Sequence, residues 1–373
     1  MVDDFAREVE AFFETLPAVM AAAGPGAMDR VRALRGAMAK ARLVGFGIPE
    51  EYGGRTDIEN GDRRFQALSD GRMPREADTL GIGLNMALPI ILQYGTEEQK
   101  KRFIATTLSA QDVWCQLYSE PEAGSDLASL RTTAVLDGDE WVVNGQKVWT
   151  SGAMNSEMGV LLARTGDQPR NRGISMLLIP MKQPGVEVRP LRQMTGAAEF
   201  NEVFFTNARV PRDWVIGEVN DGWRAATGLL AHERSSLGNV GADDKREASG
   251  HAAVPFHYLR ALAERTGYNT DPLMRQALAR AYTGEKIMGW VARRKVFPSV
   301  GKLWRTKQSR FVSETAARMT LNSSLAQEVD DKDGDFWRYF ILNAPRMSIG
   351  GGTDEIQKNT IGERALGLPR EPS

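Results

Sequence analysis

The sequence predicts a multi-domain α+β protein with an N-terminal helical domain, a middle antiparallel β-barrel or sandwich, and a C-terminal helical bundle. A long uncharged run, residues 79–96, has the composition of a buried helix. Asp137-Gly138 is a strong hairpin signal within a stretch rich in β-branched residues. From Asp221 onward, apolar residues recur at helical spacing. The expected domains span residues 1–112, 113–220 and 221–373.

The uncharged run, TLGIGLNMALPIILQYGT, is borderline in length for a membrane span, which needs about 20 apolar residues. Polar residues and a proline interrupt it: Asn85, Pro89 and Gln93. We therefore expect a helix buried inside a soluble protein, with no membrane insertion. After the run, Thr96 and Gln99 have the spacing of a capping box, which predicts the start of a second helix.

The middle of the chain reads as β structure. In TTAVLDGDEWVVNGQKVWTSG we expect two hairpins, at Asp137-Gly138 and at Asn144-Gly145, because both dipeptides favour two-residue turns. Short β-rich runs follow at regular spacing: GVLLART, GISMLLIP, GVEVRPL and FNEVFFTNARVP. This spacing is typical of an antiparallel sandwich or barrel of about 100 residues.

Composition argues against several classes of protein. The formal charge is −1 and the charges are interspersed, which speaks against binding of nucleic acid or of an anionic membrane. Cys115 is the one cysteine, so no disulfide framework exists within the chain. The first residues, MVDDFAREVEAFFETL, carry acids where a targeting peptide has bases and serines. We expect a cytoplasmic protein.

Metal sites and nucleophilic triads are not expected. The three histidines, His232, His251 and His257, form no HExxH motif, and no dinucleotide-binding or Walker glycine loop is present. A chain of this size with so few nucleophiles indicates that a bound cofactor supplies the chemistry.

Two segments are candidates for binding that cofactor. CQLYSEPEAGSD, residues 115–126, has strand residues and then a turn that places Ser119 and Ser125 on exposed backbone. A ligand loop and a serine-capped surface turn explain this segment equally well. Trp149, with two hydroxyl residues after it, ends a strand and has the groups to stack on and hydrogen-bond a planar heterocycle. On these residues alone, a tryptophan packed under the barrel rim is the favoured alternative.

These segments carry a resemblance to a known family. CQLYSEPEAGSD resembles the first signature of the acyl-CoA dehydrogenases, and NGQKVWTSGA resembles the second. LPIILQYGTEEQKKRF, the HER of the long helix and GGTDEIQKNTIGERALGLPRE are similar to further family segments, in the family's order. The resemblance implies the family's α–β–α architecture and a flavoprotein with FAD as cofactor. It also implies oxidation of an acyl-CoA thioester to the trans-2-enoyl-CoA, with electron-transfer flavoprotein as acceptor.

Roles are carried over by position within these motifs. The segment that the resemblance places along the flavin is Gln116, Leu117, Tyr118 and Ser119. The segment that it places over another side of the flavin is Trp149, Thr150 and Ser151. Ser125 resembles the serine that contacts the acyl-CoA, and Thr353 and Glu355 resemble residues near the cofactor at the start of the last helix.

The catalytic base is the point where this chain differs from many family members. These carry a glutamate where this chain has Gly351, preceded by a position, here Gly350, that is often tyrosine. A minority place the base on the first long helix after the β domain, at the position of Glu233. The resemblance therefore implies Glu233 as base, with Arg234 in a supporting role. The backbone N–H of Gly351 would hold the thioester oxygen.

The spacing of apolar residues is compatible with this assignment. Glu233 falls between Leu230 and Leu237 on one apolar helix face, and a carboxylate on such a face must be paired or functional. Without the resemblance, a salt bridge with Arg234 or another basic residue is the favoured explanation. With it, and with no acid at Gly351, Glu233 is the expected base.

The chain departs from the family pattern in three places. Glu122 stands where the signature usually has glycine. The RxxFGxxL segment, whose arginine often meets the FAD pyrophosphate of a neighbouring subunit, is not recognisable, and Arg265 and Arg275 are the candidate replacements. The glutamine–double-glycine segment that touches the neighbour's adenine is replaced by QEVDDKDGDFWRYF.

These departures keep alternative functions open. The chain could be a half-site or non-catalytic subunit of a heteromeric acyl-CoA dehydrogenase, so that both a homo-oligomer and a heteromer with a second, similar subunit are expected states. A flavin oxidase or monooxygenase on the same fold is a further alternative. Because the helical base position occurs in members that accept bulky acyl groups, we expect a bulky or branched acyl chain.

Overall fold

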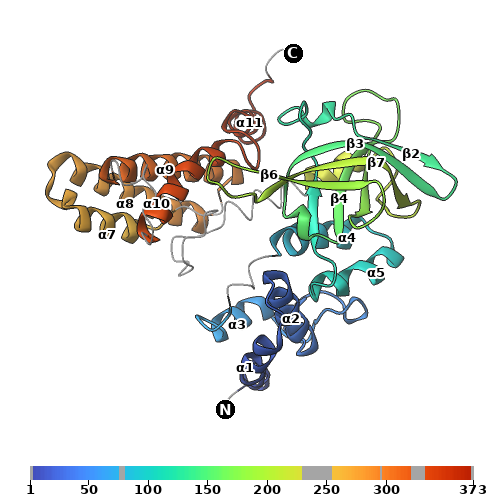
Figure 1. The fold of residues 1–373 in the computed structure, drawn as a ribbon, viewed down its shortest axis with the longest axis horizontal. Helices are drawn as coiled ribbons and strands as arrows, with labels where there is room; N and C mark the ends of the chain where they lie inside the picture. Colours follow the sequence, from blue (N-terminus) through green and yellow to red (C-terminus); the bar gives the residue numbers. More distant parts are fainter. Residues whose placement is uncertain (1–2, 75–79, 229–253, 295, 321–331, 371–373) are drawn as a thin grey trace. The chain divides into compact units, whose positions relative to one another are not determined.

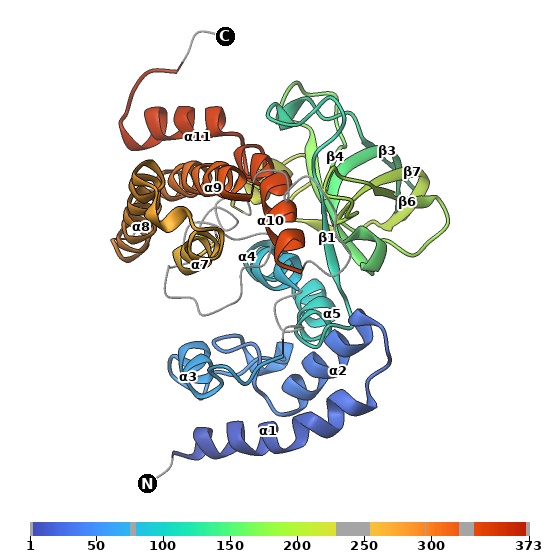
Figure 2. The ribbon, with the colours of Figure 1, turned by 60° about the vertical axis from the view of Figure 1, so that its left-hand side comes forward.

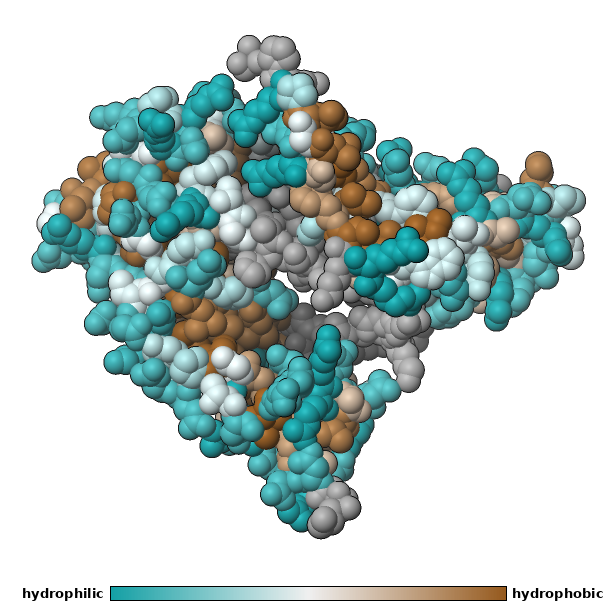
Figure 3. All heavy atoms as spheres, turned by 180° about the vertical axis from the view of Figure 1, so that it is seen from behind, coloured by the Kyte–Doolittle hydropathy of each residue, from teal (hydrophilic) through white to brown (hydrophobic). Residues whose placement is uncertain are grey.

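The computed structural model describes residues 3–74, 80–228, 254–294, 296–320 and 332–370 (Figure 1). The chain forms two compact units. The first comprises Met1–Leu191 and Ala198–Leu229, and the second comprises Arg192–Ala197 and Leu230–Ser373. No helix in the described ranges combines the length and the apolarity that crossing a membrane requires. The face shown in Figure 3 is mostly hydrophilic, with hydrophobic residues gathered in separate patches.

The first unit opens with helices. Their bounds are α1 Asp4–Ala22, α2 Ala27–Lys40, α3 Gly61–Leu68, α4 Leu88–Tyr94 and α5 Glu97–Leu108. The uncharged run is helical as predicted: a π-helical turn, Gly83–Ala87, continues into α4, and Ile90 and Ile91 are buried. The predicted capping box is also confirmed, because Thr96 and Gln99 exchange side-chain-to-backbone hydrogen bonds of 3.2 and 3.1 Å.

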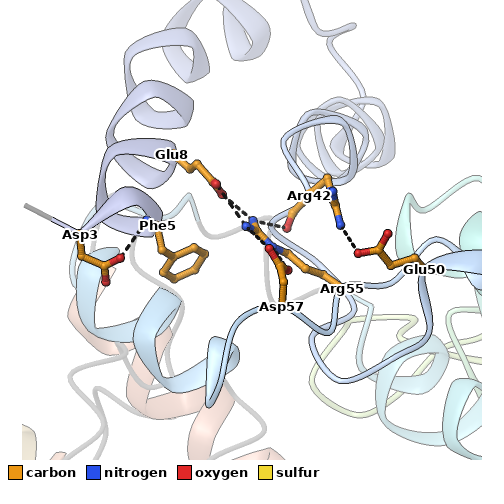
Figure 4. A network of polar contacts seen from close by, with 7 residues as sticks. All are labelled: Asp3, Phe5, Glu8, Arg42, Glu50, Arg55 and Asp57. Carbon is orange, nitrogen blue, oxygen red and sulfur yellow. Dashed lines mark hydrogen bonds and ion pairs between the residues drawn. The ribbon is translucent and has the colours of Figure 1, made fainter.

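A buried arginine ties the N-terminal helices together (Figure 4). The Arg55 side chain is 5% exposed, and its guanidinium donates to Glu8 at 2.5 Å, to Asp57 at 2.7 Å and to the carbonyl of Arg42 at 3.3 Å. It thereby joins α1, the start of the loop after α2 and the loop that carries Arg55 itself. Arg42 itself pairs at the surface with Glu50.

We predict that Arg55→Met lowers the free energy of unfolding by about 2–3 kcal/mol, because it leaves two carboxylates and a carbonyl without their shared donor. Arg42→Met is the matched control. Its ion pair with Glu50 is exposed, and such pairs contribute about 0–1 kcal/mol. Chemical denaturation of both variants checks the prediction, and equal losses in the two proteins would contradict it.

The middle of the chain forms one eight-stranded sheet in the order β6-β7-β3-β2-β4-β5-β8, with β1 paired to β4. The strand bounds are β1 Trp114–Leu117, β2 Thr133–Asp137, β3 Glu140–Ser151, β4 Met158–Arg164, β5 Ile174–Pro180, β6 Val186–Leu191, β7 Phe200–Pro211 and β8 Val215–Ile216. Most pairings are antiparallel as expected, but β1 with β4 and β2 with β4 are parallel. The sheet is therefore mixed at this one strand.

One of the two predicted hairpins is present. Asp137 pairs with Glu140, so β2 and β3 are joined by the two-residue turn at Gly138. The hairpin predicted at Asn144-Gly145 is wrong, because both residues lie inside β3, where the register shifts against β7. The physical reason is a β-bulge: Gly145 has φ of +148°, and the Asn144 side chain accepts from the backbone N–H of a residue on β7 instead of turning the chain.

Apolar side chains from most strands of the sheet form one core. Its fully buried members include Cys115, Leu117, Val143, Leu161, Leu177 and Val203. Burial raises the pKa of the Cys115 thiol to about 12, so this cysteine is an inert core residue. The helices are fixed to the sheet by hydrogen bonds, since Gln99 on α5 donates to the carbonyl of Val215 at 2.8 Å, and Trp114 donates to Thr107 on α5 at 2.9 Å.

The second unit is helical. Its helices are α7 Phe256–Thr266, α8 Pro272–Arg293, α9 Pro298–Thr320, α10 Lys332–Asn343 and α11 Asp354–Thr360. In Figures 1 and 2, α8 and α9 run alongside each other. The core between the helices is built from Leu259, Leu262, Ala281, Val312, Ala316, Trp337 and Phe340. Three large hydrophobic side chains of α8 are exposed: Leu273 at 82%, Trp290 at 53% and Tyr282 at 46%.

Candidate active site

The structure brings the two predicted cofactor segments together. β1 ends at Leu117, and the next residues run beside the end of β3. The backbone N–H of Val148 donates to the carbonyl of Ser119 at 2.9 Å, and the ammonium of Lys147 donates to the carbonyl of Tyr118 at 3.0 Å. Segments more than 25 residues apart in sequence thus present Ser119 and Trp149 on adjacent backbone.

Trp149 is held in an unusual conformation. Its backbone φ is +62°, and the register of β3 against β7 shifts between Lys147 and Thr150. The indole is 57% exposed and meets Phe200 only edge-on, at a centroid distance of 5.9 Å. A bulky residue in the left-handed region costs about 1–2 kcal/mol. Strained backbone that exposes an aromatic ring is typical of a functional site, and it rules out the alternative of a tryptophan packed under the rim.

Thr150 and its cross-strand neighbour Asn201 carry polar atoms without partners. Thr150 Oγ1 and Asn201 Nδ2 are buried, and neither forms a hydrogen bond among the described residues. Buried polar groups left in this state cost about 1–3 kcal/mol each. An exposed indole, the Ser119 and Ser151 hydroxyls and this orphaned pair make a donor and acceptor set that suits a planar heterocycle. Asn201 was not singled out from the sequence, where nothing distinguishes it from other strand asparagines.

The turn after β1 points into solvent. Ser125 is exposed, and so is Glu122, the residue that departs from the signature. Glu122 pairs with Arg131 at 2.8 Å, and both side chains are more than 70% exposed. The extra charge is therefore neutralised at the surface, away from the buried face of the loop.

In the second unit, the glycine segment forms a fixed loop before α11. Thr353 is the N-cap of α11, because its hydroxyl accepts from the N–H of Ile356 at 3.2 Å. The Gln357 side chain donates to the carbonyl of Gly351 at 2.7 Å. Asp354 in the first turn forms an ion pair with buried Lys302 on α9 at 2.9 Å. These contacts fix the loop to α9 and to the first turns of α11.

The conformation of this loop favours glycine at two of its positions. Gly351 and Gly352 have φ of +66° and +87°, a region that disfavours a glutamate at either position. No acceptor for the Gly351 N–H is found among the described residues. Glu355 faces solvent and lies near Lys358.

The remaining predicted residues are placed as follows. Glu233 and Arg234 fall in residues 229–253, outside the described residues. Arg265 lies in the last turn of α7, and Arg275 lies in the first turn of α8; both are exposed. The described candidate residues are thus divided between the units, with the Ser119 and Trp149 segments in the first unit and the glycine loop in the second.

Comparison with known families is decisive at this point. The sequence matches the N-terminal domain of acyl-CoA dehydrogenase over residues 2–111 and its middle domain over residues 115–208. The chain belongs to the acyl-CoA dehydrogenase family. The resemblance of its motifs, the α–β–α order and the expectation of an FAD-dependent oxidoreductase are confirmed with it.

Individual relatives of this acyl-CoA dehydrogenase support the assignment. Acyl-CoA dehydrogenase IpdE1 of Mycobacterium tuberculosis is 41% identical over 365 residues, covering 93% of this chain and 91% of that protein. FadE34 of the same organism is 38% identical over 76% of this chain and 39% of its own length. The solved Tcur3481–Tcur3483 steroid ACAD has a TM-score of 0.76 at 26% identity, over 99% of this chain and 97% of that chain. The ChsE4–ChsE5 complex from Mycobacterium tuberculosis has a TM-score of 0.72 at 27% identity, over 99% and 97%.

Proposed function

We propose that this acyl-CoA dehydrogenase removes hydrogens from the α and β carbons of an acyl-CoA thioester and forms the trans-2-enoyl-CoA. The observation that carries the proposal is the junction of the Ser119 and Trp149 segments, with its exposed indole and unpaired buried hydroxyl. Gln116 to Ser119 and Trp149 to Ser151 would hold the FAD from the first unit. Thr353 and Glu355 would meet it from the second. When bound, FAD supplies the hydride acceptor.

The remaining steps fall to the chain's own groups. Glu233 removes the α-proton, and Arg234 positions the Glu233 carboxylate. The α C–H group of the substrate is a very weak acid. Its thioester oxygen must therefore be stabilised as negative charge develops there. The backbone N–H of Gly351 provides that donor, and Ser125 contacts the acyl-CoA. Exclusion of water raises the pKa of a buried carboxylate and brings it nearer to that of the α-carbon.

For the substrate we propose a bulky, polycyclic or branched acyl group. Support comes from the Tcur3481–Tcur3483 structures, whose title describes a steroid ACAD. It also comes from the glycine loop, because a Cβ added at Gly350 would have, among the described residues, only the Arg346 carbonyl near it, at 3.6 Å. Gly350 and Gly351 carry no side chain at positions where family members often have a tyrosine and a glutamate.

A heteromeric assembly is the second candidate, and specific observations favour it. The solved relatives Tcur3481–Tcur3483 and ChsE4–ChsE5 carry two protein names each. This chain lacks the arginine segment that serves the neighbour's FAD, and α8 leaves Leu273 and Trp290 exposed. In this version the chain contributes the base, and a partner subunit completes the cofactor site. Electron-transfer flavoprotein is the proposed acceptor in both versions.

The test is to purify the chain alone and co-expressed with an acyl-CoA dehydrogenase-like neighbouring gene product. We expect FAD absorbance in at least one preparation and its anaerobic bleaching by a bulky acyl-CoA, with an enoyl-CoA as product. FAD uptake only in the co-expressed protein would establish the heteromer. Turnover that consumes oxygen and releases peroxide, with no reduction of electron-transfer flavoprotein, would replace the dehydrogenase by an oxidase. Bound FAD that no acyl-CoA bleaches would overturn the proposed function.

A further inference from the structure

Lys147 is a fully buried cation at the junction of the two cofactor segments. Its side chain is 0% exposed, and its ammonium donates to Glu120 at 2.7 Å and to the carbonyl of Tyr118 at 3.0 Å. Burial lowers the pKa of Lys147 to about 8, while the Glu120 charge acts in the opposite direction. A lysine is almost never fully buried unless it is paired, so the buried ammonium of Lys147 depends on these two partners.

Glu120 is the other half of the pair and is anchored on a third segment. It is 8% exposed, and it accepts from the backbone N–H groups of Arg131 at 2.6 Å and of Thr132 at 2.9 Å. Burial alone would raise its pKa, but the Lys147 charge and these donors leave the pKa below its usual value. The carboxylate is therefore fully engaged and ionised at neutral pH.

The pair joins the loop after β1, the start of β2 and the bulged end of β3. Lys147 is the last regular residue of β3 before the register shift, and Trp149 follows two residues later with its left-handed backbone. The bond to the Tyr118 carbonyl fixes the residue directly before Ser119. One buried ammonium thus links the loop that carries Ser119 to the strand end that carries Trp149.

We propose that Lys147 is a positioning residue for the flavin: its bond to the Tyr118 carbonyl, oriented by Glu120, sets the spacing at which the Ser119 and Trp149 segments both meet one cofactor. The inference rests on the proposed function, because it assigns the cofactor to this junction. A lysine that only stabilised the sheet would make the same ion pair. The two roles differ in what happens when the bond to Tyr118 is lost while the fold is kept.

Three variants separate the roles. Glu120→Gln removes the carboxylate but keeps Lys147, whose amine still donates to the Tyr118 carbonyl when neutral. Lys147→Met leaves Glu120 buried without its cation, which is strongly destabilising. The double variant Lys147→Met/Glu120→Gln contains no uncompensated buried charge, so its unfolding temperature recovers, but the Tyr118 carbonyl still lacks its donor. Arg55→Met is the matched control, a buried ionic anchor of the same unit outside the junction.

The measurements are the FAD dissociation constant, the visible circular dichroism of bound flavin and the unfolding temperature. They are made on the wild-type preparation that takes up FAD, alone or with its co-expressed subunit. We expect the double variant to bind FAD at least about tenfold more weakly than Glu120→Gln, with altered flavin dichroism. Arg55→Met should lose stability and keep both flavin readouts. If the double variant does not fold, Lys147→Leu combined with Glu120→Gln replaces it in the comparison, because leucine also has no donor for the Tyr118 carbonyl.

Equal FAD affinity and equal dichroism in the Glu120→Gln and double variants would overturn the positioning role and leave the proposed function intact. So would a loss of affinity in Arg55→Met that matches the loss in the double variant, because affinity would then follow stability alone. A wild-type protein that takes up no FAD in either preparation would overturn the proposed function itself, and the role of Lys147 with it.

Discussion

A Glu233→Gln protein is expected to bind FAD as tightly as the wild type and to lose at least about 10³-fold in kcat with its best acyl-CoA. The amide matches the carboxylate in shape and has no basic oxygen, and removing a general base typically costs 10²–10⁴-fold. The α-proton is so weakly acidic that no water molecule in a closed site replaces the base. Anaerobic mixing with acyl-CoA, followed by flavin absorbance, measures the step directly.

The control for this experiment is Glu264→Gln on α7, a carboxylate that is 55% exposed and pairs with Arg260 in the preceding turn. It should bleach at the wild-type rate. Wild-type bleaching by Glu233→Gln would remove Glu233 from the mechanism. Because Gly350, Gly351 and Gly352 carry no acidic side chain, the base would then have to be a carboxylate outside these three positions.

Gly145→Ala is expected to destabilise the first unit by about 3–5 kcal/mol and to lower its unfolding temperature by roughly 10 °C. A Cβ on Gly145 would lie 2.5 Å from Thr132 Oγ1 and 2.7 Å from Thr132 Cα, and the backbone φ of +148° disfavours any side chain. The main-chain atom cannot move aside, because the N–H of Thr132 is bonded to buried Glu120.

Gly138→Ala in the same hairpin provides the comparison. Gly138 also has a positive φ, +63°, but an added Cβ would meet no atom within 4 Å. The expected loss in the free energy of unfolding is therefore only that of placing alanine in the left-handed backbone region, about 1–2 kcal/mol. Thermal and chemical denaturation of both proteins tests the difference, and equal destabilisation would show that the contact with Thr132 relaxes freely.

Local signals in the sequence predicted the helices and one hairpin well. The capping box at Thr96 depends on two residues that are three positions apart. A motif this local can be recognised in the sequence without any tertiary information. Asn144-Gly145 carries the same turn signal as Asp137-Gly138, yet the chain continues straight through it. The long β3–β7 pairing decides this, because a turn at Gly145 would break it on both sides. A bulge and a hairpin share the same residues, and only the partner strand distinguishes them.

The candidate site was also only partly predictable, because local motifs identify its residues but not the long-range contacts between them. Motif resemblance named Ser119 and Trp149, but their adjacency depends on a β1–β3 contact that no local pattern encodes. Lys147 did have a usable signal: period-two alternation places it on the same face of β3 as buried Trp141 and Val143. A lysine on a core-facing side of a strand needs a buried acidic partner, and that partner is Glu120. Asn201 had no such signal.

The buried state of Cys115 has a practical consequence for chemical labelling. It is the one thiol of the chain, it is fully enclosed in the sheet core, and its pKa of about 12 leaves almost no thiolate at neutral pH. Maleimide and iodoacetamide are therefore expected not to label the folded wild-type protein. A thiol introduced at Met154, which is 54% exposed just after β3, would be the one reactive handle on the folded protein. A fluorophore attached there would sit beside Trp149's segment without any native cysteine having to be removed.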